Sequence, residues 1–227
     1  MAYAVMMITN GADSGFGKFA AEARDFLFHT NFASFAERKD HFMKYLIISG
    51  NPKKDGLCDS ALKEAVRGAA DGGADVEVVT VEKLERCHVC GDGWGVCWDQ
   101  NRCAFGGDGF DEIHEKVKKA DQLCVITPVY WWEMAESVKC FIDRLRRCEF
   151  GQNGALAGKQ VLLVDSAGGT GNGGIGCLEQ MERFCKHTAL NVFDAIYVNR
   201  WNNDYKKAAI YAAARAMSEG RKAGETL

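Results

Sequence analysis

The chain has 227 residues, of which 47% are hydrophobic, and a formal net charge of −3. This hydrophobic content can form a core and argues against disorder, and the small net charge gives no reason to expect a nucleic acid or an anionic membrane as partner. No apolar run reaches the roughly 18 residues of a membrane-spanning helix, and the first residues lack the pattern of a secretory signal, so we expect a cytoplasmic protein.

Residues 1–42 do not share the pattern of the rest of the chain. They contain the glycines Gly11, Gly15 and Gly17 after the apolar run 4–9, a spacing similar to the glycine motif of short-chain dehydrogenases. The chain before the next predicted strand is too short for the remainder of a dinucleotide-binding fold. We therefore predict an N-terminal extension of unknown role over residues 1–42 and one domain over residues 43–227.

From Met43 onward, apolar runs typical of buried strands alternate with apolar residues at helical spacing. The predicted strands are residues 45–48, 76–81, 123–126, 161–164 and 192–198, and the predicted helices are 57–69, 110–119, 134–145, 175–187 and 206–220. Such alternation predicts an α/β fold with a doubly wound, five-stranded parallel sheet in the order 2-1-3-4-5. In this arrangement ligands bind outside the carboxyl ends of the strands, so the loops after strands 1, 3 and 4 deserve most interest.

The loop after the first strand, residues 49–60, contains a glycine turn that leads into a helix. Such a turn presents backbone N–H groups to an anion, and the helix dipole adds to the attraction. An ordinary turn with solvated lysines is the alternative reading. We predict that this loop binds a phosphate through Ser49, Asn51, Lys53, Gly56, Leu57, Cys58 and Ser60.

Four cysteines, Cys87, Cys90, Cys97 and Cys103, lie in an irregular segment between the second strand and the next helix. Four thiolates are the ligand set of a [4Fe–4S] cluster or of zinc. The spacing by itself leaves three readings open: an iron–sulfur cluster, a zinc ion, or no metal. His88 is a further potential ligand.

The loop after the third strand holds three consecutive aromatic residues. It consists of Pro128, Val129, Tyr130, Trp131 and Trp132, and the strand is expected to stop at residues 127–128. The isoalloxazine ring of a flavin is flat and apolar on its faces, so aromatic side chains can stack on it while loop N–H groups bond its polar rim. Aromatic side chains buried at a strand end are the plainer alternative. We predict that this loop contacts a flavin.

The loop after the fourth strand, residues 166–174, contains five glycines in nine residues. This many glycines let the backbone approach a ligand closely, and they also suit a mobile lid. From this loop we expect Ser166, Gly168 and Gly169 to contact the cofactor.

Together these loops resemble the NAD(P)H-dependent FMN reductases, a family with a flavodoxin-like fold. Residues 50–53 are similar to its Gly-Ser-Pro-Arg phosphate loop, and residues 128–131 with 138–144 are similar to its Pro-Val-Tyr-Trp and Leu-Lys-Ala-Phe-Ile-Asp-Arg segments. Cys58 and Asp59 replace the usual Asn or Ser and Thr, and an aspartate beside a phosphate is unfavourable unless it points away. Iron–sulfur flavoproteins, a branch of the family, carry a compact Cys-x2-Cys-x2-Cys run at this place. In this chain the second gap, between Cys90 and Cys97, is four residues longer.

The resemblance implies FMN as cofactor and NAD(P)H as electron donor, with a quinone, a flavin or another small molecule as acceptor. Because the cofactor carries this chemistry, we predict no catalytic side chain. Two alternatives are an FMN protein, with or without a [4Fe–4S] cluster, that exchanges electrons with a protein partner, and a binding module that has lost its flavin. A homodimer or homotetramer is expected, because the aromatic loop would otherwise expose apolar surface.

Overall fold

The computed structural model of the protein describes residues 42–224. The glycine motif at 11–17 and the predicted extension, apart from Phe42, lie outside this range. The strands are β1 Lys44–Ser49, β2 Asp75–Thr80, β3 Gln122–Tyr130, β4 Glu133–Met134, β5 Gln160–Ala167 and β6 Asn191–Asn199. The helices are α2 Leu57–Asp71, α3 Val96–Gln100, α4 Phe110–Lys119, α5 Glu136–Cys148, α6 Gly174–Thr188 and α7 Asn203–Ser218, with short 3-10 turns at Gly106–Asp108 and Gly151–Asn153.

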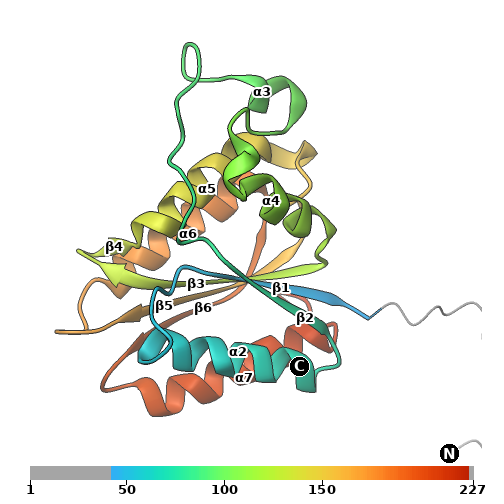
Figure 1. The fold of residues 1–227 in the computed structure, drawn as a ribbon. Coiled ribbons are helices and arrows are strands. Elements are labelled where there is room, and N and C mark those ends of the chain that lie inside the picture. Colours follow the sequence, from blue (N-terminus) through green and yellow to red (C-terminus); the bar gives the residue numbers. More distant parts are fainter. Residues whose placement is uncertain (1–41, 225–227) are drawn as a thin grey trace, which may run out of the picture. The chain divides into compact units, whose positions relative to one another are not determined.

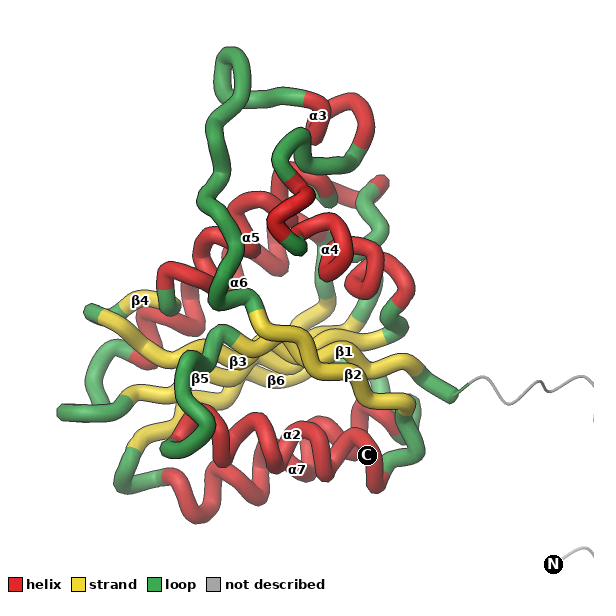
Figure 2. Tube along the Cα trace, in the orientation of Figure 1, coloured by secondary structure: helices red, strands yellow, loops and turns green. Residues whose placement is uncertain are grey.

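A parallel sheet with strand order β2-β1-β3-β5-β6 runs through the middle of residues 42–224 (Figure 2). The five parallel strands therefore have the predicted order. Helices α2 and α7 cover one face of the sheet, and α4, α5 and α6 cover the other (Figure 1). None of the helices in the described part of the chain is long and apolar enough to cross a membrane.

Each central strand supplies side chains to both faces, which is why its sequence is apolar throughout. In β1, Leu46 and Ile48 belong to the core beneath α4, α5 and α6, whereas Tyr45 and Ile47 belong to the core beneath α2 and α7. Helices α2 and α7 approach closely at Gly68, where a Cβ would lie 2.3 Å from the carbonyl oxygen of Tyr211. Alternation within one strand thus produces two cores of different composition.

Strand β3 does not stop at residues 127–128, as the sequence predicted, but continues to Tyr130. Proline lacks the N–H group that a sheet ladder needs, so it usually lies where no neighbouring strand is waiting. The carbonyl oxygen of Ile126 accepts a hydrogen bond from Gly50 N–H, so Pro128, two residues on, faces the same side. Strand β1 has already ended at Ser49, and the proline therefore leaves no partner unsatisfied on that side.

Two more predicted boundaries were wrong at the same edge of the sheet. Residue 134, expected to begin a helix, instead forms strand β4 with residue 133 and pairs antiparallel with β3, and helix α5 begins only at Glu136. Ser166 and Ala167, expected in a loop, extend β5 because β6 continues alongside as far as Asn199. Both differences depend on strand pairing between residues that local sequence patterns do not reveal.

Candidate functional site

A pocket of about 640 Å³ opens at the carboxyl ends of β1, β3 and β5, within the size range of ligand sites. It lies at the switch point of the sheet, and all three predicted loops contribute to it. Its walls contain the predicted residues Asn51, Lys53, Gly56, Leu57, Cys58, Pro128, Val129, Tyr130, Trp131, Trp132, Ser166, Gly168 and Gly169, together with Pro52, Asp55, Ala167, Thr170 and Asn172, which were not predicted.

Two of the predicted cofactor-binding residues are not in the pocket wall. Ser49 is buried at the end of β1, where its hydroxyl accepts a hydrogen bond from Asn51 N–H at 3.3 Å. Ser60 lies in the first turn of α2 and donates its hydroxyl proton to the carbonyl oxygen of Leu57 at 2.8 Å. Both hydroxyls thus bond to the backbone of the loop or the helix start, and contact of these serines with a ligand stays a prediction.

The loop after β1 leaves the N-terminus of α2 open to the pocket. Gly56 precedes this helix with φ of 95°, which favours glycine, and among the described residues no side chain caps the first N–H groups. Asn51 stabilises the turn, because its side-chain oxygen accepts Lys53 N–H at 3.2 Å. Asp59 forms an ion pair with Lys63 at 2.7 Å, one turn along α2. The carboxylate that seemed unfavourable for a phosphate is therefore neutralised within the helix.

The aromatic loop is a two-residue hairpin turn. Val129 and Tyr130 of β3 pair with Met134 and Glu133 of β4, and the turn between them consists of Trp131 and Trp132. Both tryptophans have positive φ, 50° and 70°, which such hairpin turns require and which usually selects Asn or Gly. Each costs about 1 kcal/mol or more in this conformation. Two tryptophans at strained positions indicate that their rings, rather than the turn, are what the site needs.

The wall of the pocket includes a thiol, a hydroxyl and a phenol. Burial raises the pKa of Cys58 to about 12, so its thiol stays protonated at neutral pH. Ser166 lies beside this thiol, and its buried hydroxyl has no well-formed hydrogen bond among the described residues. Burial also raises the pKa of Tyr130, with Cys58 and Glu136 adding to the effect. Cys58, Ser166 and Tyr130 are therefore neutral hydrogen-bond donors at neutral pH, whereas the Asp55 carboxylate lies elsewhere in the same wall.

One residue behind the pocket, Asp165, was not predicted. It precedes Ser166 in β5 and is fully buried, and neither carboxylate oxygen has a well-formed hydrogen bond among the described residues. Burial raises its pKa to about 8, with the Cys177 thiol opposing the shift. The sequence could have identified Asp165 as a site residue, because it directly follows the predicted buried strand 161–164.

The four predicted metal ligands line a second, smaller cavity. Cys87, Cys90, Cys97 and Cys103 surround it with Cys148, Arg144 and Arg147. Its volume is about 20 Å³, room for little more than one water molecule. Among the described residues no three His, Cys, Asp or Glu side chains lie in an arrangement that could hold a metal ion. The ligand set of a cluster is thus gathered, but its coordination geometry is not formed.

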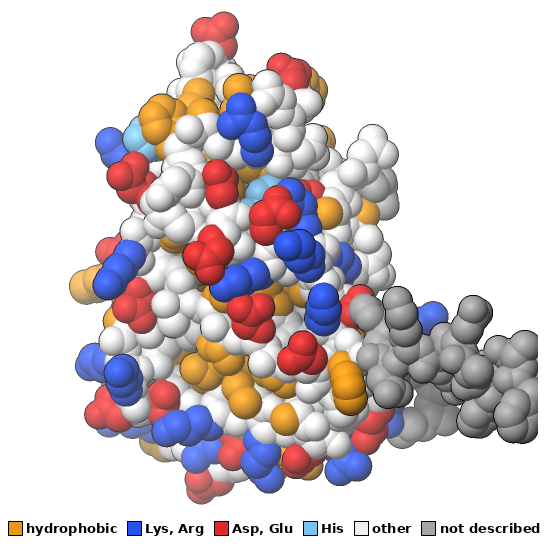
Figure 3. Space-filling view, turned by 45° about the vertical axis from the view of Figure 1, so that its right-hand side comes forward, with side chains coloured by type: hydrophobic (Ala, Val, Ile, Leu, Met, Phe, Trp, Pro, Cys, Tyr) orange, Lys and Arg blue, Asp and Glu red, His pale blue; other side chains and the backbone are white. Residues whose placement is uncertain are grey.

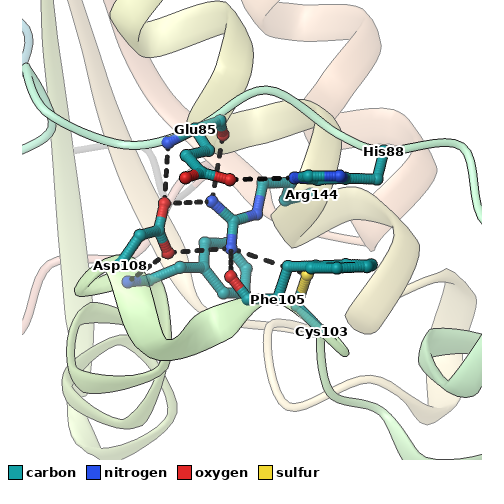
Figure 4. A network of polar contacts seen from close by, with 7 residues as sticks. Glu85, His88, Cys103, Phe105, Asp108 and Arg144 are labelled. Atoms are coloured by element: carbon teal, nitrogen blue, oxygen red, sulfur yellow. Dashed lines mark hydrogen bonds and ion pairs between the residues drawn. The ribbon is translucent and has the colours of Figure 1, made fainter.

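Arg144 of α5 organises the segment that carries these cysteines (Figure 4). Its guanidinium is 1% exposed and donates to the carbonyl oxygens of Glu85, at 3.0 Å, and Phe105, at 2.7 Å. It also forms two bonds to the Asp108 carboxylate, at 2.6 and 3.0 Å, and a longer contact to Cys103 Sγ at 3.5 Å. One side chain therefore joins both ends of the segment to the domain. Arg144 lies three residues after Phe141 in the predicted helix, so the sequence already placed it on the same buried face.

The surface of the described residues shows no extended patch of one charge on the face in Figure 3, where basic and acidic side chains are interspersed. Several large hydrophobic side chains are exposed, and some of them lie near the two cavities. Trp131, Trp132 and Trp201 lie near the first pocket, and Trp98 and Phe105 lie near the cysteine segment. The predicted association into a homodimer or homotetramer rests on such surface and stays a prediction.

The fold and the pocket define a flavodoxin-like α/β protein with an open ligand site at the switch point of its sheet. Residues 43–203 match the family of NADPH-dependent FMN reductases, and the chain belongs to this family. The resemblance inferred from the three loops is thereby confirmed.

Individual relatives carry two kinds of name. An iron–sulfur flavoprotein of Methanosarcina thermophila is 36% identical over 137 residues, which are 58% of this chain and 66% of the relative. An FMN-dependent NADH:quinone oxidoreductase of Thiobacillus denitrificans is 33% identical over 67 residues, 26% of this chain and 33% of the relative. The chain spans 51% to 66% of the length of three iron–sulfur flavoproteins that it matches.

Solved structures show the same fold. The NAD(P)H:quinone oxidoreductase of Methanothermobacter marburgensis superposes with a TM-score of 0.57 and 15% sequence identity, over 80% of this chain and all of that one. An archaeal flavodoxin superposes with a TM-score of 0.52 and 12% identity, over 78% of this chain and 97% of that one.

Proposed function

We propose that the protein is an FMN-dependent oxidoreductase that passes electrons from NAD(P)H to a small acceptor such as a quinone or a flavin. The observation that carries the proposal is the pocket of about 640 Å³ in which the phosphate loop, the aromatic turn and the glycine loop meet. FMN, when bound, would supply the hydride acceptance and electron transfer that no side chain of the chain provides.

The residues of the pocket fit the parts of this cofactor. The N-terminus of α2 would hold the phosphate, since no side chain of residues 42–224 caps its first N–H groups. Tyr130, Trp131 and Trp132 would stack against the flat ring, and the buried hydroxyl of Ser166 would bond its polar rim. Because the pocket lies open, a nicotinamide and an acceptor could reach the ring in turn.

We expect the purified protein to bind FMN and the bound flavin to be bleached rapidly by NADPH or NADH in a stopped-flow experiment. Tyr130→Ala should weaken FMN binding about tenfold, because the phenol packs at the ring site. Trp98→Ala removes an exposed aromatic side chain within the cysteine segment, away from the first pocket, and serves as the control. Bleaching by dithionite but by neither nicotinamide nucleotide would contradict the enzyme. A protein that stays colourless with FMN would favour a lost cofactor site.

A second candidate is an FMN protein with an iron–sulfur cluster that exchanges electrons with a protein partner. The observation in its favour is that Cys87, Cys90, Cys97 and Cys103, separated by up to six residues, line one cavity. Their present arrangement does not form a site, so a cluster would require the segment to open around it. This second candidate is supported by the similarity of the chain to relatives named iron–sulfur flavoproteins.

Iron and acid-labile sulfide, measured in protein purified without oxygen, should accompany a broad absorbance beside the flavin bands if this candidate is right. Cys97→Ser should lower both contents, whereas Cys177→Ser, which removes a buried thiol outside the cavity, should not. Zinc without sulfide, or no metal in either sample, would rule the iron–sulfur candidate out.

A further inference from the structure

The glycine loop, residues 168–173, forms the third wall of the proposed flavin pocket. Gly168, Gly169, Thr170 and Asn172 all face the pocket. Gly169, Gly171 and Gly173 have positive φ, of 48°, 70° and 92°, so the loop follows a path that other residues rarely adopt. A chain this rich in glycine has many alternative conformations, and something must select the one that lines the pocket.

On one side the loop is fixed by the aromatic turn. A Cβ at Gly173 would lie 2.7 Å from Cα of Trp132 and 3.0 Å from its Cγ. Because the first of these is a backbone atom, the turn cannot move aside easily. The start of α6 also follows the turn closely, since a Cβ at Gly176 would lie 3.3 Å from the carbonyl oxygen of Trp132.

On the other side the loop meets Trp201, which follows β6 and was not among the predicted site residues. A Cβ at Gly171 would lie 2.4 Å from Cζ3 and 3.1 Å from Cε3 of this indole, so the ring lies directly against the loop backbone. The neighbouring Arg200 donates a hydrogen bond to the carbonyl oxygen of Gly169, and its guanidinium lies 6.0 Å from the Trp201 ring centroid. Two successive residues thus hold the loop at two successive glycines of the sequence Gly-Thr-Gly.

The backbone of Trp201 is itself held in a tight turn. The Asn199 side-chain oxygen accepts the N–H groups of Trp201, at 2.9 Å, and Asn202, at 3.0 Å. In return, the Asn202 side-chain oxygen accepts Asn199 N–H at 2.7 Å. The turn fixes the backbone from which the indole projects, and 70% of Trp201 is exposed to solvent. Because so much of the indole is exposed, burial stabilises it little, and the ring lies against the backbone of the glycine loop.

We propose that Trp201, assisted by Arg200, is a positioning residue that holds the glycine loop against the flavin site. This inference rests on the proposed function, because the ligand that the loop would face is FMN. Trp201 acts only through Gly171 and is not itself in the pocket wall. The loop is thereby clamped between two tryptophans that follow different strands.

Titration of the apoprotein with FMN tests the proposal. We expect Trp201→Ala to weaken FMN binding about tenfold, because the ligand must then order the loop itself. Trp201→Phe, which keeps a ring on Gly171, should restore most of the affinity. Tyr205→Ala removes a similarly exposed aromatic side chain of α7 and should leave binding unchanged. Equal affinity of wild type and Trp201→Ala would overturn the proposal.

A second measurement needs no flavin. In the apoprotein, Gly171→Ala should lower the thermal midpoint more in the wild type than in Trp201→Ala, because the added methyl group collides with the ring only when the ring is present. Strain from the positive φ at residue 171 is common to both backgrounds and cancels in the comparison. Additive effects would show that the ring does not hold the loop. If the wild type fails to bind FMN, the proposed function fails while this coupling can still be measured.

Discussion

Replacing Asp165 with asparagine should make the protein progressively more stable than the wild type as the pH rises from about 4 to about 8. In the folded protein burial raises the pKa of Asp165 from 3.8 to about 8. Between these values the unfolded chain releases the proton and the folded chain keeps it. The stability contributed by the protonated carboxyl is therefore complete below pH 4 and is lost as the pH rises through 8.

The expected effect is large. A shift of about four pKa units corresponds to at most about 5 kcal/mol of unfolding free energy. Asp165→Asn has no proton to release, so the difference in unfolding free energy between variant and wild type should grow by several kcal/mol over this range. The difference in unfolding free energy at pH 4 reports how well the fold accommodates the buried asparagine amide. Only the change of this difference with pH tests the pKa of Asp165.

Urea unfolding at several pH values measures this difference. Asp92→Asn, which alters an exposed carboxylate of the cysteine segment, is the control and should show no comparable trend. A difference that stays constant from pH 4 to pH 8 would show that Asp165 is ionised in the folded protein. The proposed site depends on this point, because a neutral Asp165 places no negative charge behind the wall that would face FMN.

Replacing Arg144 with methionine should lower the unfolding free energy by about 3–5 kcal/mol, the usual cost of breaking a buried ion pair. The variant would leave the Asp108 carboxylate and the carbonyl oxygens of Glu85 and Phe105 without their donor (Figure 4). It would also remove the guanidinium that lies 4.2 Å from the Phe110 ring centroid. Methionine fills a similar volume, so the loss would come from unpaired polar groups rather than from a void.

The loss should depend on pH in a definite direction. Burial acts to raise the pKa of Asp108, but hydrogen bonds from Arg144 and from the N–H groups of Glu85 and Phe110 outweigh it and hold the pKa below its usual value. The paired carboxylate therefore contributes stability above pH 4 that is lost on acidification. Arg144→Met should differ most from the wild type at neutral pH and less in acid.

Arg146→Met, two residues further along α5, is the matched control, because Arg146 lies in the groove between α5 and α6 and not in this network. Adding Asp108→Asn to Arg144→Met should recover part of the loss, since no carboxylate is then left unpaired. Thiol labelling should show faster modification of Cys87, Cys90, Cys97 and Cys103 in Arg144→Met. A stable variant with unchanged labelling would mean that the segment is held by other contacts.

The amino-acid sequence determined the sheet order and the loops at its carboxyl edge. Runs such as 45–48 and 161–164 are apolar because both faces of a central strand are buried, and this requirement is visible in a few consecutive residues. Glycine and aromatic side chains identified the pocket loops because their local conformational and stacking properties are unusual.

Only the tertiary structure decided the roles of residues whose environment comes from distant segments. Trp201 meets Gly171 across the edge of the sheet, and Arg144 binds groups as far back as Glu85. Strand β4 pairs with the part of β3 that continues beyond β1, and the four predicted cysteine ligands line one cavity together with Arg144. Burial and pairing energies depend on which atoms the fold brings within a few ångströms, and no local pattern of residues contains that information.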